Sequence, residues 1–398
     1  MSFTNKIDEW MKEAEDRPES AVMIVRLIAR RLRELSERDE ELLAENIALQ
    51  NGTRVEEYQK RIAHLEYQLD LLKRRFSLSD GMLMEPEVEA AEIPTKNILA
   101  YNSYGRILRV EVDPNQQTLG RITDQIVNDR EPPRLLCISS NEEVLLLFTS
   151  GRVSTHKVSE IPSVSIGSNW SWEGAALPDE PRAGEWLACI MPFSNLPLSD
   201  CFLQVSRRGC VKNTMTSLAQ SVLSNHYLGK GTIQKSDQPL DVILGQKKDR
   251  FAFVTREGKL LGLDVDELSY SAEERIRLTA TDFVVASFLA QPNKSMLFVT
   301  QTGKVIQRES DNLELSKSPL AKGQPLISTS RLAQGVRFVG AISVKEKDHV
   351  AVLDAAGSLT VHVAESIAGA GSIEAEGLTG EAVSIGVIPA DNMTRAES

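Results

Sequence analysis

Six short glycine turns, each flanked by strand-like segments, recur from Lys96 onward and constrain the fold more than any other feature. The turn glycines are Gly105, Gly151, Gly209, Gly258, Gly303 and Gly357, at separations of 46, 58, 49, 45 and 54 residues. These separations are too long for a solenoid of short turns and suit units of about four strands each. Six such units indicate radial closure. The sequence therefore predicts a mainly β, propeller-like disc of six four-stranded blades over residues 96–388.

Each unit contains a β-hairpin. In the fourth unit, Phe251 and Phe253 precede the turn T-R-E-G-K, and Leu261, Leu263 and Val265 follow it with period two. Period two is typical of an antiparallel ribbon with one buried face. The glycine supplies the positive φ that a tight loop requires.

The units share a motif around the turn. An apolar strand, then Ser or Thr one or two residues before G-[RK]-[VIL], then a strand ending near [SD]-E-[IL] recur in TSGRVSTHKVSEIP, VSRRGCVKNTMTSL, VTREGKLLGLDVDEL and VTQTGKVIQ. This pattern resembles the repeat of the C-terminal domains of DNA gyrase A and topoisomerase IV. The resemblance covers residues 96 to about 388 and implies a six-bladed β-pinwheel whose basic rim binds and bends duplex DNA.

The chain departs from that family in two ways. The family's wrapping box, Q-R-R-G-G-K-G, corresponds here to NHYLGKG at residues 225–231, which lacks both arginines. We therefore expect bending of DNA rather than strong chiral wrapping. The family's DNA-cleaving region is absent, and no Walker, nucleophile-elbow or H-E-x-x-H motif occurs. We expect no enzyme activity, no cofactor and, because the histidines show no ligand spacing, no metal.

Basic side chains recur at and just after the turns and are the candidate DNA-binding residues. They are Arg106, Arg109, Arg152, Lys157, Arg207, Arg208, Lys212, Lys230, Arg256, Lys259, Lys304 and Arg308. Equivalent positions of a disc would share one rim, where a row of cations could neutralise successive phosphates. Any single one of these residues could equally well be a solvated charge on a hairpin.

Two parts of this set carry more specific expectations. Arg207, Arg208 and Lys212 are expected on an exposed turn. Lys230 lies between two glycines, whose backbone amides could help to hold a phosphate. A β-bulge would explain the same glycines.

Residues 1–79 have a different pattern, which predicts an α-helical coiled coil. From Val55 to Phe76 the apolar positions alternate in steps of three and four, as on an a/d seam. Asn51-Gly52 separates this seam from an earlier one, so either the helix turns back as a hairpin or one helix tolerates a stutter. Residues 80–95 are acidic with two prolines and predict a linker. Residues 389–398 predict a disordered tail.

The formal net charge of -11 opposes binding to a polyanion. Residues 1–95 hold 14 Lys or Arg against 21 Asp or Glu, which leaves 31 against 35 for residues 96–398. The excess acid is therefore concentrated outside the predicted disc. No signal peptide or membrane-spanning run is evident, and the four cysteines fit a reducing compartment. We expect a cytoplasmic, nucleoid-associated protein that binds duplex DNA and no membrane.

Two other functions stay open. Propeller-like discs host many binding activities, so the chain could be a protein-interaction scaffold. It could also supply a gyrase-like arm to separately encoded topoisomerase subunits. Basic residues that are dispersed, or neutralised by nearby acids, would favour the scaffold.

The coiled coil should self-associate or bind a partner protein, because its seam would otherwise expose a continuous apolar stripe. Sedimentation of residues 1–80 is expected to show a species larger than the monomer. A monomer whose second seam folds back on the first would contradict this expectation.

Overall fold

The computed structural model describes residues 94–390, except 114–115, 126–130, 174, 176, 178, 195, 374–377 and 379. The chain divides into two compact units, Met1–Glu92 and Ile93–Ser398, and the described residues belong to the second. The predicted coiled coil, nearly all of the predicted linker and most of the predicted tail lie outside the described residues.

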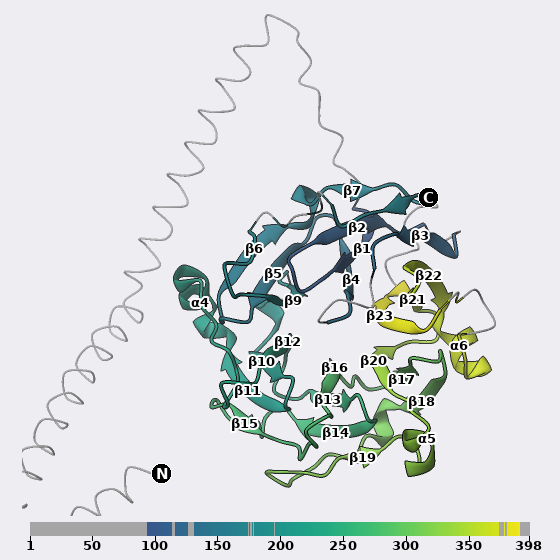
Figure 1. Ribbon diagram of the computed structural model, residues 1–398. Coiled ribbons are helices and arrows are strands. Elements are labelled where there is room, and N and C mark those ends of the chain that lie inside the picture. The colour runs from purple at the N-terminus through teal and green to yellow at the C-terminus, as the bar shows by residue number, and fades with distance from the viewer. Residues whose placement is uncertain are drawn as a thin grey trace, which may run out of the picture. The chain divides into compact units, whose positions relative to one another are not determined.

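The described residues form six β-sheets, which are arranged as blades around a common centre (Figure 1). From the centre outward, blade 1 consists of β4 (Arg134–Ser139), β1 (Lys96–Tyr101), β2 (Ile107–Glu111) and β7 (Ser163–Val164). Blade 2 consists of β9 (Leu187–Pro192), β5 (Glu143–Phe148) and β6 (Val153–Lys157). Blade 3 consists of β12 (Pro239–Gly245), β10 (Cys201–Ser206), β11 (Cys210–Met215) and β15 (Glu273–Glu274).

The second half of the ring follows the same plan. Blade 4 consists of β16 (Val284–Leu289), β13 (Arg250–Thr255), β14 (Lys259–Asp264) and β19 (Gln324–Pro325); blade 5 of β20 (Phe338–Val344), β17 (Ser295–Thr300) and β18 (Val305–Glu309); and blade 6 of β23 (Ala382–Ile388), β21 (His349–Asp354), β22 (Ser358–Val363), β3 (Thr118–Ile122) and β8 (Asn169–Trp170). Short helices α4 (Ala219–Asn225), α5 (Thr329–Ala333) and α6 (Ala364–Ala370) lie in the connections.

The predicted mainly β arrangement of six blades is confirmed, but the blades are not uniformly four-stranded. As described, three sheets have four strands, two have three and one has five. The reason is that the outermost strand of a blade comes from another repeat. A segment that follows the hairpin of each repeat, called the crossing segment below, runs along the outer edge of the preceding blade. Thus β7 of repeat 2 pairs with β2, and β15 of repeat 4 pairs with β11. In blade 2 the crossing segment forms only an isolated bridge, between Tyr227 and Arg152.

The turn glycines hold these crossing segments. All six have φ between 77° and 94°, and the carbonyl of each accepts a hydrogen bond from a crossing backbone N–H. The donor and acceptor pairs are Leu177 to Gly105, Leu228 to Gly151, Arg275 to Gly209, Leu326 to Gly258, Ile373 to Gly303 and Ile122 to Gly357, at 2.8–3.0 Å. Glycine is needed for close approach as well as for φ. A Cβ at Gly357 would lie 1.9 Å from the carbonyl oxygen of Ile122.

A Ser or Thr three residues before the turn glycine, not one or two residues before it as in the predicted motif, closes the turn in two blades. In blade 4, Thr255 Oγ1 accepts a hydrogen bond of 3.1 Å from the N–H of Lys259, and in blade 3 Ser206 Oγ accepts one of 2.9 Å from Cys210. A side-chain acceptor here satisfies an N–H that the hairpin ladder leaves over.

The hydrophobic core consists of clusters between neighbouring blades. In β5, Val144 and Leu146 pack toward blade 1, whereas Leu145 and Leu147 pack toward blade 3. The central strands are therefore buried on both faces, which explains apolar runs without polar alternation. The expectation that the hairpin of repeat 4 has only one buried face is wrong, because all of β13 after its first residue is buried.

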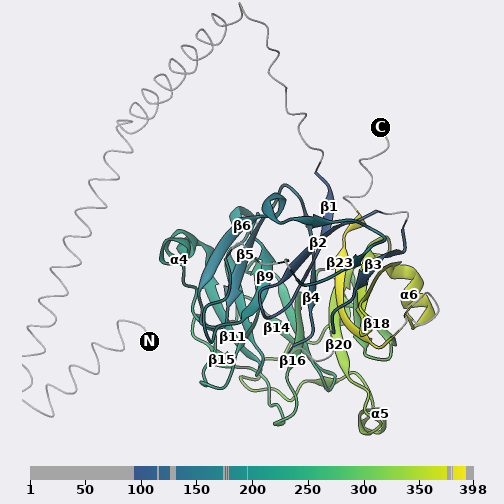
Figure 2. The ribbon, with the colours of Figure 1, turned by 45° about the horizontal axis from the view of Figure 1, so that its top comes forward.

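Blade 6 closes the ring against blade 1. Strand β3, from repeat 1, pairs with β22, and β23 lies beside β4 (Figures 1 and 2). Trp170 and Trp172 are buried in the cluster between these two blades. The closing interface is thus built like the other five.

Gly357→Ala should lower the free energy of unfolding by about 3 kcal/mol or more, because a left-handed backbone and an overpacked contact each add a cost. Gly335→Ala is the matched control. Gly335 has the same φ of 87° and nothing within 4 Å of its Cβ position, so only about 1–2 kcal/mol should be lost. Urea unfolding followed by tryptophan fluorescence measures both, and equal losses would contradict the role of the crossing contact.

Candidate nucleic-acid interface

The residue two positions before each turn glycine lies beside the inner strands, not at the outer edge. Arg256 donates its backbone N–H to the carbonyl of Phe283 at 2.8 Å and accepts from the N–H of Phe338 at 2.9 Å. Arg207 accepts in the same way from Val284. The side chains of Arg207 and Arg256 therefore line one mouth of the central channel, and they do not share the outer rim expected for them.

Arg207 and Arg208 are held by structural contacts. The guanidinium of Arg207 lies 4.4 Å from the centre of the Phe283 ring and forms an ion pair with Glu131. Arg208 donates to the carbonyls of Thr279 at 3.0 Å and Asp282 at 2.7 Å. Neither residue lies on the freely exposed turn that the sequence suggested, because segments of repeats 1 and 4 contact them.

Arg152 is not accessible to a phosphate. Its guanidinium lies 3.8 Å from the centre of the Phe148 ring and forms ion pairs of 2.8 Å with Glu185 and 2.7 Å with Asp179. Burial disfavours the charged form of Glu185, but hydrogen bonds from Arg152, the backbone N–H of Arg182 and Ser150 lower its pKa to about 2. Arg152 therefore stabilises the connection between β6 and β9, which contains Asp179 and Glu185.

Other candidates also have protein partners. Lys259 forms an ion pair of 3.2 Å with the buried Asp282. Arg109 donates to the carbonyl of Val158 at 3.0 Å. Arg106 lies 3.9 Å from Glu180, and its side chain is 41% exposed. Of these three, Arg106 is the most accessible to an external anion.

The remaining candidates lie on the outer strands and crossing segments. Lys157 and Lys304 are exposed, and Lys212 and Arg308 are half-buried. Lys230 is exposed in the crossing segment of blade 2, where Gln204 Nε2 donates to the carbonyl of Gly229 at 3.0 Å. The segment 225–231 is therefore not a bulge in a strand.

Two exposed cations on the crossing segments, Arg277 and Lys322, were not among the candidates. Arg277 follows Arg275, the residue that donates to Gly209, by two positions, as Lys230 follows Leu228. Ala321, beside Lys322, bonds to the backbone of Arg275 and Arg277 at 2.9 and 2.8 Å. The two side chains thus come from adjoining segments. Neither residue lies in the turn motif. Their position at the outer edge could be predicted only if the path of the crossing segments were known.

Acidic side chains interrupt this outer layer. Glu274 and Glu314 are exposed, and Glu314 accepts a hydrogen bond of 2.5 Å from Gln324 Nε2. The cations at Lys230, Arg277 and Lys322 therefore form a discontinuous row over blades 2 to 4 rather than a uniform basic band.

Other kinds of site find little support in the described residues. Among them, no group of His, Cys, Asp and Glu side chains could hold a metal ion, and no helix has the length and apolarity to cross a bilayer. The four cysteines are free thiols, and burial raises the pKa of Cys137 to about 12.

The fold is that of a six-bladed β-pinwheel of the gyrase type. A structure of the DNA gyrase A C-terminal domain is similar with a TM-score of 0.54 at 15% identity, covering 74% of this chain and 99% of that one. A crystal structure of the C-terminal domain of DNA topoisomerase IV has a TM-score of 0.48 at 16% identity, covering 75% of this chain and 95% of that one. At these identities the likeness concerns the fold. No family profile and no curated protein sequence matches the chain.

Glu185→Gln should lower the free energy of unfolding at neutral pH by about 3 kcal/mol, because it leaves the buried Arg152 cation without the more buried of its two carboxylate partners. The pKa of Glu185 is lowered in the folded state, so its contribution is complete above its ordinary value of 4.5 and is lost as the pH falls toward about 2. The variant should lack this part of the acid dependence in urea titrations. Glu180→Gln, with a 65% exposed side chain, is the control and should change little. Equal behaviour of the two variants would refute the assignment.

Proposed function

We propose that the pinwheel binds duplex DNA along the outer layer of blades 2 to 4. The observation that carries the proposal is the row of exposed cations at Lys230, Arg277 and Lys322 on successive crossing segments. Lys157, Lys212, Lys304, Arg308 and Arg106 would extend the contact along the outer strands. Duplex DNA presents charge continuously, so a spaced row of cations on a curved edge suits it.

The contact is to phosphates and not to base edges. The described helices α4, α5 and α6 have only 5 to 7 residues, which is short for a recognition helix in the major groove. Lys and Arg on a convex edge position a protein on the backbone without reading sequence. Binding should therefore depend on salt and hardly on sequence.

The same arrangement favours bending over stable wrapping. Following a curved protein edge requires bent DNA, whose cost must be offset by phosphate contacts. Here the row is interrupted by Glu274 and Glu314, and segment 225–231 supplies one lysine and no arginine. Nicked circles sealed in the presence of the protein should therefore capture little writhe.

In this proposal the protein is a non-catalytic accessory that modulates DNA topology in the nucleoid. It acts either alone or as an arm of separately encoded topoisomerase subunits, with the predicted coiled coil providing self-association or a partner. The similar C-terminal domain of DNA gyrase A supports this assignment through its fold.

One observation favours the alternative of a protein scaffold. Leu198, which is 72% exposed, lies near the exposed Met215 and Leu218 on blade 3. Thr216 Oγ1, next to Met215, donates to the carbonyl of Ser199 at 2.7 Å, which joins the two segments. Exposed apolar side chains that adjoin in this way are typical of a protein contact.

The combined variant Lys230→Gln, Arg277→Gln and Lys322→Gln tests the DNA proposal. If about five phosphates are neutralised, the logarithm of the affinity should fall against the logarithm of salt with a slope of about -4.5. The variant should reduce that slope by about 2–3 units. Fluorescence anisotropy with duplexes of unrelated sequence measures both quantities.

A control with the same change of charge is Lys247→Gln, Lys248→Gln and Lys347→Gln. These exposed lysines lie in turns at the opposite end of the blades from the turn glycines. The control should keep the original slope. A folded protein without salt-dependent duplex binding, or an equal loss in both variants, would overturn the proposal and favour the scaffold.

A further inference from the structure

The inner strands surround a channel with a cavity volume of about 820 Å³. Strands β4, β12, β16, β20 and β23 all contribute to its lining. Cavities that bind small organic molecules are about 300–1,000 Å³. The channel is therefore large enough for a ligand of that size.

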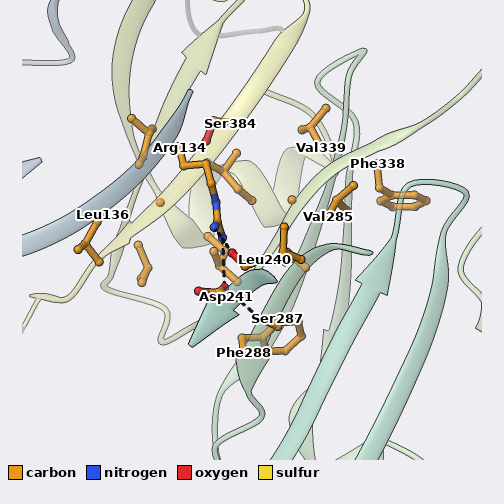
Figure 3. Close-up of a pocket in the computed structure, with 18 of the residues that line it drawn as sticks. Arg134, Leu136, Leu240, Asp241, Val285, Ser287, Phe288, Phe338, Val339 and Ser384 are labelled. Atoms are coloured by element: carbon orange, nitrogen blue, oxygen red, sulfur yellow. Dashed lines mark hydrogen bonds and ion pairs between the residues drawn. The ribbon is translucent and has the colours of Figure 1, made fainter. Parts of the chain in front are cut away.

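The wall is largely apolar toward the channel. Along β16, buried and half-exposed residues alternate, and the half-buried Val285 lines the cavity while it also packs against the cluster between blades 4 and 5. Val339 and Val383 occupy similar half-exposed positions at the start of β20 and β23. Figure 3 shows Val285 and Val339 on the same side of the cavity. An apolar ligand in the cavity would remove these side chains from water, which is favourable.

Three polar side chains of the wall, those of Arg134, Asp241 and Ser287, satisfy one another. Arg134 forms an ion pair of 3.1 Å with Asp241 and donates to the carbonyl of Leu240 at 2.6 Å. Ser287 Oγ donates to the same Asp241 carboxylate at 3.0 Å (Figure 3). The network therefore presents no unpaired charge to the apolar side of the cavity.

One mouth of the channel does offer a cation. Arg256 is exposed and forms no ion pair with any described residue, and its guanidinium lies 5.6 Å from the centre of the Phe283 ring. Arg207, on the same ring, is neutralised by Glu131. Glu381, also exposed, lines the cavity and adds one negative charge.

We propose that the channel binds an amphipathic organic anion, with its apolar body against Val285, Val339 and Val383 and its anionic group at Arg256. An apolar body removes the half-exposed valines from water. The anionic group has a cation at the mouth that no carboxylate of the described residues neutralises. This site is separate from the outer layer and does not depend on DNA binding.

Anilinonaphthalene sulfonate is a suitable probe, and phenylnaphthylamine is its uncharged counterpart. The full chain should bind one molecule of the anion, detected by its fluorescence. Arg256→Gln should weaken the anion about fivefold, which corresponds to about 1 kcal/mol, and Glu381→Gln should strengthen it. Neither change should alter binding of the uncharged probe.

Val285→Trp should weaken binding of both probes by placing an indole ring where their apolar body lies. Val363→Trp, at an exposed position on β22, is the control and should leave binding intact, with circular dichroism and thermal unfolding reporting that each variant is folded. Val383→Trp replaces the first variant if that one does not fold. The proposal is overturned if no saturable binding occurs, if the folded Val285→Trp or Val383→Trp variant binds both probes as tightly as the original chain, or if the charge changes affect both probes alike.

Discussion

The backbone hydrogen bond from a crossing segment to a turn glycine is the interaction on which the rest of this structure depends. Its donor and acceptor belong to consecutive repeats, as with Leu228 and Gly151. No repeat can therefore complete a blade from its own residues, and the apolar clusters lie between blades for the same reason. Each repeat is therefore stabilised by its neighbours. The hydrogen bond from Ile122 to Gly357 joins the first repeat to the last in the same way.

The number of repeats could be predicted from the sequence because the turn is a local feature. A positive φ at Gly258 requires glycine whatever surrounds it, and the strands on either side carry β-forming residues. The exchange of strands between repeats could not be predicted, since it joins residues that are one repeat length or more apart in the sequence. For the same reason the apolar run of β5 gave no indication of which neighbour each face would meet.

The candidate interface was predictable only in part, because position relative to the glycine decides where a basic residue lies. Two positions before it, as at Arg256, the side chain lies at the channel mouth. The position after it lies at or just before the start of an outer strand, where Lys304 is exposed but Arg152 is covered by the loop that contains Glu185. Arg277 escaped notice because only the crossing places it at the outer edge.

The sheet of blade 6 can be completed only after the sixth repeat has been synthesised. This sheet combines β3 and β8, made early, with β21 to β23, made last, and Arg121 Nε bonds to the carbonyl of Ala356 across 235 residues. Such distant pairing slows folding. Until the last repeat leaves the ribosome, β3 has an unpaired edge that can join a strand of another nascent chain. The step most open to chaperones is therefore this final pairing.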